Sequence, residues 1–238
     1  DSAQAKAAVT EARASFDTFN IDLMYALPGQ TLAQLQADLD TALAFAPPHL
    51  SIYHLTIEPN TAFAQSPPSL PDADLASDML DMITSRTASS GLARYEVSAF
   101  ARSGHRCMHN LNYWQFGDYL GIGAGAHGKL SFPDRVVRQV RWREPAMYMD
   151  KALGGQAMSN EHSVGGAELP FEFMLNALRL AEGLELARFA ERTGQPLTSI
   201  EPALARAEQR GLITRDASWV RPTALGFDFL SDLQTLFL

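Results

Sequence analysis

The stretch FNIDLMYALPGQT, residues 19–31, decides the fold class. Residues 19–27 are mostly apolar, with β-branched and aromatic members, which predicts a buried strand. The PGQT that follows breaks this strand, and Thr31 is well placed to cap a helix in which Leu32, Leu35 and Leu39 recur at helical spacing. A strand that turns directly into a helix is the repeating unit of an α/β fold.

The same alternation extends on both sides of this stretch. Residues 5–16 predict an amphipathic helix and residues 50–57 a second buried strand. Residues 72–89 predict another helix, and a third strand is expected around residues 95–100. The order helix, strand, helix, strand, helix, strand predicts a parallel sheet or a barrel.

The first residue is Asp1, not an initiator methionine. The chain then opens directly into the predicted helix of residues 5–16, with no element before it to pack against. Both features favour a fragment of a longer protein.

The composition predicts a soluble globular protein of a reducing compartment such as the cytoplasm. Hydrophobic residues make up 46% and charged residues 19%, which excludes a disordered chain. The net charge of -8 argues against a general affinity for nucleic acid or an anionic membrane. A single cysteine excludes an internal disulfide, and no apolar run approaches the roughly 20 residues of a membrane span.

The pattern changes near Arg102, and residues 102–130 are rich in glycine, histidine and asparagine. Residues 135–142, RVVRQVRW, alternate like an edge hairpin, and residues 154–168, rich in glycine and polar side chains, predict a linker. Residues 169–238 read as helix, helix, two-strand wing and a last helix capped by Thr223, which is winged-helix-like. Glu201 and Glu208 lie on the predicted second helix beside its arginines, so a packing module is favoured over a nucleic-acid reader.

A glycine-rich segment, GIGAGAHG, covers residues 121–128 and contains G-x-G-x-x-G at Gly123, Gly125 and Gly128. A dinucleotide fingerprint needs a helix immediately after the glycines and an acidic residue about 20 positions further on. Here a Phe-Pro-Asp turn follows, so we reject that interpretation. The glycines are expected to let the backbone pass close to a ligand or to another strand.

Asp22 is the one charged residue in a strand predicted to be buried, where an unpaired carboxylate is costly. Either it bridges a neighbouring element, or it points at the open end of the sheet and accepts hydrogen bonds from hydroxyl groups of a ligand. The carboxyl ends of strands carry the ligand sites in such folds.

The segment GHRCMHNLNYW, residues 104–114, holds the only cysteine, Cys107, between His105 and His109. These three side chains are too few and too crowded for a closed zinc site, and a redox thiol lacks a second cysteine. A structural segment would start a helix near Asn110 and bury the aromatic rings. As a haem or porphyrin loop, the segment would offer His109 as an axial iron ligand, with Tyr113 and Trp114 beside a large apolar ring.

The order of motifs along the chain is more specific than any one of them. NIDLMYALPGQT, HLSIYHLTIEPNT, CMHNLNYW, DYLGIGAGAHGKL and LRLAEGL follow one another in this order. Together they resemble the radical S-adenosylmethionine family of oxygen-independent coproporphyrinogen III oxidase-like proteins. The HNxxYW pattern resembles its HemW branch of haem chaperones.

The resemblance implies an α/β fold: a partial (β/α)6 barrel of the radical SAM type, of which residues 1–130 would be the C-terminal half. Residues 131–168 would follow as hairpin and linker, and residues 169–238 as the winged-helix-like module. It also implies a [4Fe-4S] cluster on a CxxxCxxC motif, with S-adenosylmethionine on its unique iron. That motif is absent here, so we expect no radical chemistry from this chain alone.

Site residues carry over from the resemblance at a few positions. Asp22 would contact the ribose hydroxyls of S-adenosylmethionine, with Met24 and Thr56 lining the same pocket. His109 would be the haem ligand, and its support would come from Asn110, Tyr113 and Trp114.

The resemblance therefore implies the C-terminal part of a haem chaperone, which binds haem and passes it to haem-accepting proteins. The alternative is an oxygen-independent coproporphyrinogen III oxidase, an enzyme of porphyrin synthesis. A third interpretation is a helical interaction module carried on a barrel, with no small-molecule role.

Overall fold

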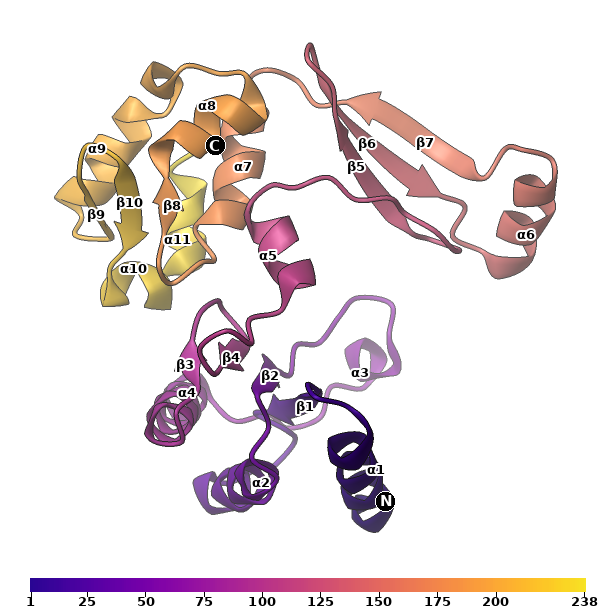
Figure 1. The fold of residues 1–238 in the computed structure, drawn as a ribbon, viewed down its shortest axis with the longest axis vertical. Helices are drawn as coiled ribbons and strands as arrows, with labels where there is room; N and C mark the ends of the chain where they lie inside the picture. The colour runs from indigo at the N-terminus through magenta and orange to yellow at the C-terminus, as the bar shows by residue number, and fades with distance from the viewer. The chain divides into compact units, whose positions relative to one another are not determined.

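The structure is a computed structural model that describes residues 1–238. It contains two compact units, Asp1–Cys107 and Met108–Leu238, and Figure 1 shows their elements in chain order. Each unit has its own hydrophobic core. None of the helices is both long enough and apolar enough to cross a membrane.

The first unit is an open α/β sheet with its helices. Its elements are α1 (Ser2–Ser15), β1 (Asn20–Tyr25), α2 (Leu32–Ala44), β2 (His49–His54), α3 (Ala62–Gln65), α4 (Ala73–Ser89), β3 (Ala93–Arg94) and β4 (Ala99–Ala101). The sheet order is β1-β2-β4-β3, and β1 pairs with β2 in parallel. The predicted cap at Thr31 is confirmed, because its side chain accepts a hydrogen bond from the main-chain N–H of Gln34. The sheet does not close into a barrel, as expected for part of one.

The third predicted strand is wrong in direction. In place of one parallel strand over residues 95–100, β3 and β4 form an antiparallel pair, and β4 lies between β2 and β3. The intervening turn has its own hydrogen bonds: the Arg94 guanidinium donates to Val97 O, and the Ser98 N–H donates to the Glu96 carboxylate. Side-chain bonds of this local kind reverse the chain, and strand periodicity does not reveal them.

The prediction that β1 is a buried strand is also wrong, because only one of its faces is buried. Tyr25 belongs to the core that contains Leu35 and Leu39 of α2, and Ile21 and Leu23 are partly buried against it. Asn20, Asp22 and Met24 alternate with them and are exposed. Successive side chains of a strand point to opposite faces of the sheet, so these three exposed side chains lie on the same face of β1.

The second unit begins with α5 (Met108–Trp114) and a three-stranded antiparallel sheet. The strands are β5 (His127–Ser131), β6 (Val136–Arg141) and β7 (Met158–Ser163), and α6 (Pro145–Leu153) lies between β6 and β7 in the chain. β6 is therefore the central strand and not an edge. β7 lies inside the segment predicted as a linker; all of its residues are exposed, so it shows no apolar alternation.

The rest of the second unit is the winged-helix-like module, in which helices precede a pair of strands and further helices follow it, as predicted (Figure 1). The strand β8 and a third helix before the wing were not predicted. Its elements are α7 (Leu169–Ala177), β8 (Leu184–Glu185), α8 (Leu186–Thr193), the 3-10 turn η1 (Leu197–Ser199), α9 (Glu201–Gln209), β9 (Ile213–Arg215), β10 (Trp219–Pro222), α10 (Ala224–Asp228) and α11 (Leu230–Thr235). The strands pair in the order β8-β10-β9. Thr223 caps α10, as predicted, by accepting from the Gly226 N–H at 3.0 Å.

Candidate functional site

The first candidate site is the open face of β1 and β2 at their carboxyl ends. The parallel register places Met24 beside Tyr53, and these side chains are 46% and 44% exposed. The pairing continues past β2, because the Leu55 N–H donates to Tyr25 O at 3.0 Å. Thr56 follows and is exposed. Met24 and Thr56 thus come from the carboxyl ends of two adjacent strands, and Asp22 lies two residues before Met24 on the same face of β1.

Asp22 is exposed, so the desolvation cost expected for a buried carboxylate does not arise. Its Oδ1 atom accepts a hydrogen bond from Asn20 Nδ2 at 2.6 Å, and no basic side chain forms an ion pair with it. The carboxylate does not bridge to another helix or loop. An ionised carboxylate in this position can accept bonds from the hydroxyl groups of a ligand.

The second candidate site is the exposed side of α5. His109 and Tyr113 are one helical turn apart, and their rings meet edge to face with centroids 4.7 Å apart. Tyr113 in turn contacts the ring of Tyr119 with centroids at 4.5 Å. His109 itself is exposed, so its imidazole is accessible to a ligand while aromatic contacts restrict its motion.

Asn110 and Trp114 lie on a different side of α5. They too are one turn apart, but both are half-buried, and the Arg179 guanidinium lies 4.2 Å from the centroid of the Trp114 ring. Trp114 lines a small cavity of about 40 Å³ together with Phe173 and Trp219 of the terminal module. Its Nε1 atom is buried without a hydrogen-bond partner. The four residues carried over from the resemblance therefore lie on two sides of α5: exposed His109 with half-buried Tyr113 on one, and half-buried Asn110 and Trp114 on the other.

The histidine, cysteine, aspartate and glutamate side chains do not form a metal site. No group of three or more His, Cys, Asp or Glu side chains could hold a metal ion. Cys107 is a half-buried free thiol, while His105 and His109 are exposed. An iron–sulfur cluster of the implied type needs several thiolates, so the residues present do not fit it.

The glycine-rich segment serves backbone packing. The strand β5 follows it, not a helix, so no helix N-terminus is available for a pyrophosphate. A Cβ atom on Gly121 would lie 2.5 Å from His127 O, and the Arg141 guanidinium donates to Gly121 O at 2.9 Å. The backbone at Gly121 therefore passes close to the backbone at the start of β5.

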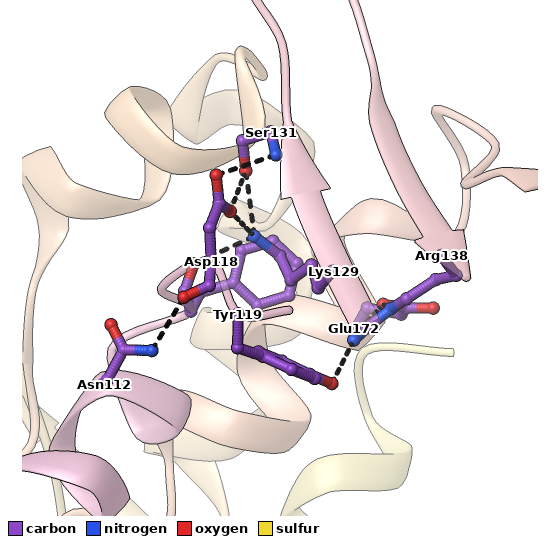
Figure 2. A network of polar contacts seen from close by, with 8 residues as sticks. Asn112, Asp118, Tyr119, Lys129, Ser131, Arg138 and Glu172 are labelled. Carbon is purple, nitrogen blue, oxygen red and sulfur yellow. Dashed lines mark hydrogen bonds and ion pairs between the residues drawn. The ribbon is translucent and has the colours of Figure 1, made fainter. Parts of the chain in front are cut away.

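A buried lysine, which sequence reasoning missed, fixes the segment between α5 and β5 (Figure 2). Lys129 Nζ donates to Phe116 O at 3.0 Å, to Asp118 Oδ1 at 2.9 Å and to Ser131 Oγ at 2.9 Å. The ammonium also lies 4.1 Å from the centroid of the Phe116 ring. Burial lowers the pKa of Lys129, and the bond to Asp118 offsets part of that shift.

The same network reaches the aromatic residues of the second candidate site. Arg138 Nη1 donates to the Tyr119 hydroxyl at 3.0 Å, and its Nε donates to Glu172 of α7 at 3.0 Å (Figure 2). A hydrogen bond from Arg138 to Tyr119 and the ring contacts of Tyr119 with Tyr113 and of Tyr113 with His109 therefore follow one another. A lone lysine in an alternating strand gives no sequence signal for such a network.

The terminal module matches a known domain. Residues 166–229 match the family model of the HemN C-terminal domain. A solved structure of coproporphyrinogen III oxidase (HemN) from Escherichia coli, described as a radical SAM enzyme, matches with a TM-score of 0.78. The match covers 100% of this chain and 58% of that chain at 20% sequence identity, so the likeness is one of fold.

Relatives of higher identity are haem chaperones. The heme chaperone HemW of Escherichia coli strain K12 is 42% identical over 93% of this chain and 58% of its own length. HemW of Haemophilus influenzae is 42% identical over 100% of this chain and 62% of its own length. HemW of Bacillus subtilis is 34% identical over 89% of this chain and 56% of its own length. The chain thus spans between 56% and 62% of the length of these relatives.

The open α/β sheet followed by the HemN C-terminal domain has the fold of the matching part of the HemN structure. Along nearly its whole length the chain is homologous to HemW proteins, with 42% identity to two of them.

Proposed function

We propose that the protein is a haem chaperone that binds haem through His109 and delivers it to haem-accepting proteins. The observation that carries this proposal is an accessible imidazole on α5 whose ring is held edge to face by Tyr113. A neutral imidazole nitrogen is a common axial ligand of haem iron, and an adjacent aromatic ring offers apolar contact to a porphyrin. The likeness to relatives that are named haem chaperones supports the same assignment.

S-adenosylmethionine is the proposed second ligand. Asp22 accepts hydrogen bonds from its ribose hydroxyls, while Met24 and Thr56 line the pocket from the same end of the sheet. When bound to an iron–sulfur cluster, S-adenosylmethionine supplies radical chemistry in the family; the cluster ligands lie outside the residues of this chain. The role of this chain is to hold the nucleoside part of the ligand and, separately, the haem.

A haem titration tests the first assignment. Addition of haem to the chain should produce a Soret band, and His109→Ala should weaken both the band and the affinity by about tenfold or more, as expected when an iron ligand is lost. His105→Ala is the matched control, because His105 is an exposed histidine of the same segment outside HNLNYW. Equal spectra for wild type and His109→Ala would remove His109 from the site.

A transfer assay tests delivery. Haem bound to the chain should move to an apoprotein such as apomyoglobin, and His109→Ala should change the transfer rate while His105→Ala should not. Decarboxylation of coproporphyrinogen III by the anaerobically reconstituted protein would instead assign the oxidase activity.

A further inference from the structure

A continuous series of hydrogen bonds crosses the first unit from its interior to Asp22. The Cys107 N–H donates to the Tyr95 hydroxyl oxygen at 3.2 Å, and the Tyr95 hydroxyl lies 2.9 Å from His49 Nε2. His49 Nδ1 lies 2.6 Å from Asn20 Oδ1, and Asn20 Nδ2 donates to Asp22 Oδ1 at 2.6 Å. Four side chains and one main-chain amide are thus joined end to end.

The chemistry of the groups fixes the direction of every bond in this series. A carboxylate only accepts, so Asn20 presents its amide nitrogen to Asp22 and its carbonyl oxygen to His49. That oxygen only accepts, so His49 carries its hydrogen on Nδ1. His49 Nε2 is then the acceptor, and the Tyr95 hydroxyl donates to it while accepting from Cys107. Each group donates toward Asp22, an arrangement in which successive bonds polarise one another.

The series runs from buried to exposed groups. Tyr95 is 2% exposed and His49 is 5% exposed, whereas Asp22 is exposed. The Ser51 hydroxyl also donates to Asn20 Oδ1, at 3.1 Å, so the amide of Asn20 is held by two donors. Burial lowers the pKa of His49, with Asp22 opposing part of that shift, so the imidazole is neutral near pH 7, as the bond directions require.

We propose that Asn20, His49 and Tyr95 are positioning residues that hold the carboxylate of Asp22 in one orientation for the ribose hydroxyls of a nucleoside ligand. This inference rests on the proposed S-adenosylmethionine site. An exposed aspartate alone would lose rotamer freedom when the ligand binds, whereas this one is already held by Asn20. Loss of the orientation should weaken binding by about 2- to 10-fold, the range expected for immobilising one side chain.

The test is a titration of the chain with S-adenosylmethionine, followed by the methyl resonance of Met24 in labelled protein. Adenosine and 2′-deoxyadenosine serve as competitors, because their ratio of affinities reports the contact to a ribose hydroxyl. Asp22→Ala should abolish the preference for adenosine. Asn20→Ala and His49→Gln should reduce both the preference and the affinity for S-adenosylmethionine.

His49→Asn is the conservative variant, because its amide nitrogen can take the place of Nδ1 and donate to Asn20 Oδ1. It should retain more of the preference for adenosine than His49→Gln, which a merely structural role of His49 would not predict. His54→Gln is the matched control on β2, since His54 contacts Tyr25 and no member of the series.

The outcomes separate the inference from the proposed function. Should S-adenosylmethionine fail to bind, or bind Asp22→Ala as well as wild type, the site at Asp22 is wrong. Should Asp22→Ala weaken binding while Asn20→Ala and His49→Gln bind like wild type, the site stands and the positioning role is overturned. Asn20 is exposed, so Asn20→Ala should fold. This variant therefore tests the positioning role even if His49→Gln fails to fold.

Discussion

Lys129 Nζ lies 2.9 Å from Asp118 Oδ1, with the lysine side chain 2% exposed and the aspartate side chain 39% exposed. The two partners therefore differ in what their removal leaves behind. Asp118→Asn leaves an ammonium buried with only neutral acceptors, so it should destabilise the second unit by about 3 kcal/mol. Lys129→Met removes the buried charge and leaves a carboxylate that water reaches, so it should cost about 1 kcal/mol.

Urea unfolding monitored by tryptophan fluorescence measures this difference, because Trp114, Trp142 and Trp219 all lie in the second unit. Asp134→Asn is the control for a surface pair, since Arg135 and Asp134 are well exposed, and it should change stability by less than about 1 kcal/mol. Equal costs for Asp118→Asn and Lys129→Met would contradict the asymmetry.

The same pair predicts how the second unit responds to acid. Burial raises the pKa of Asp118, but the hydrogen bonds from Ser131 and Lys129 lower it more, so the net shift is downward. A carboxyl group with a depressed folded-state pKa contributes stability above its unfolded value of about 4, and that contribution is lost as the pH falls through the folded pKa. Wild type should lose stability below about pH 4 more steeply than Asp118→Asn, by the same fluorescence measurement.

The buried imidazole of His49 should make the stability of the first unit depend on pH. Burial depresses its folded-state pKa, so between the unfolded value of about 6.5 and the lower folded value the unfolded chain binds a proton that the folded chain does not. The free energy of unfolding of the first unit should therefore fall as the pH is lowered through that window. Above the window the contribution of neutral His49 to stability is fully present. Amide hydrogen exchange of β2 measured at pH 8 and pH 5.5 tests this, and His49→Asn should flatten the response.

Local signals in the sequence predicted the elements that depend on local bonds. Thr31 and Thr223 cap α2 and α10 as expected, because a capping hydroxyl bonds only to the next turn of its own chain. β7 was missed because all of its side chains are exposed and its strand bonds are made by the main chain. The burial of Lys129 depends on Asp118 and Phe116, which the fold brings to it, so the residue type alone could not reveal it.

In the candidate sites too, the sequence predicted some features and only the structure revealed others. The residue types pointed to Asp22 and His109, but only the structure separates Tyr113, on the face of His109, from Trp114, which packs into the terminal module. The series of bonds from Cys107 to Asp22 joins segments far apart in sequence, and no spacing rule predicts it.

Substitution of Gly226 by alanine should destabilise the protein, which is the opposite of what helix propensity predicts. It is buried in α10, where alanine would ordinarily stabilise a helix by about 1 kcal/mol. A Cβ atom there would lie 1.8 Å from Leu212 O, so Gly226→Ala should instead cost about 3 kcal/mol through forced displacement of the backbone. Gly211→Ala is the control: its φ of 69° strains alanine, but no atom lies within 4 Å, so about 1 kcal/mol is expected. A smaller cost for Gly226→Ala than for Gly211→Ala in urea unfolding would refute this account.

At the haem site proposed for His109, substitutions of Tyr113 test how the aromatic contacts affect haem binding. Its ring touches both His109 and Tyr119, so it restrains the imidazole from one side while the other side stays open. Tyr113→Phe keeps the ring and should bind haem with an affinity close to that of wild type. Tyr113→Leu removes the edge contacts, each worth about 0.5–1.5 kcal/mol, and should weaken haem binding by about 2- to 10-fold. The Soret titration measures both variants. If Tyr113→Leu binds as tightly as Tyr113→Phe, ring contact does not orient His109, and the imidazole would have to be held by the haem alone.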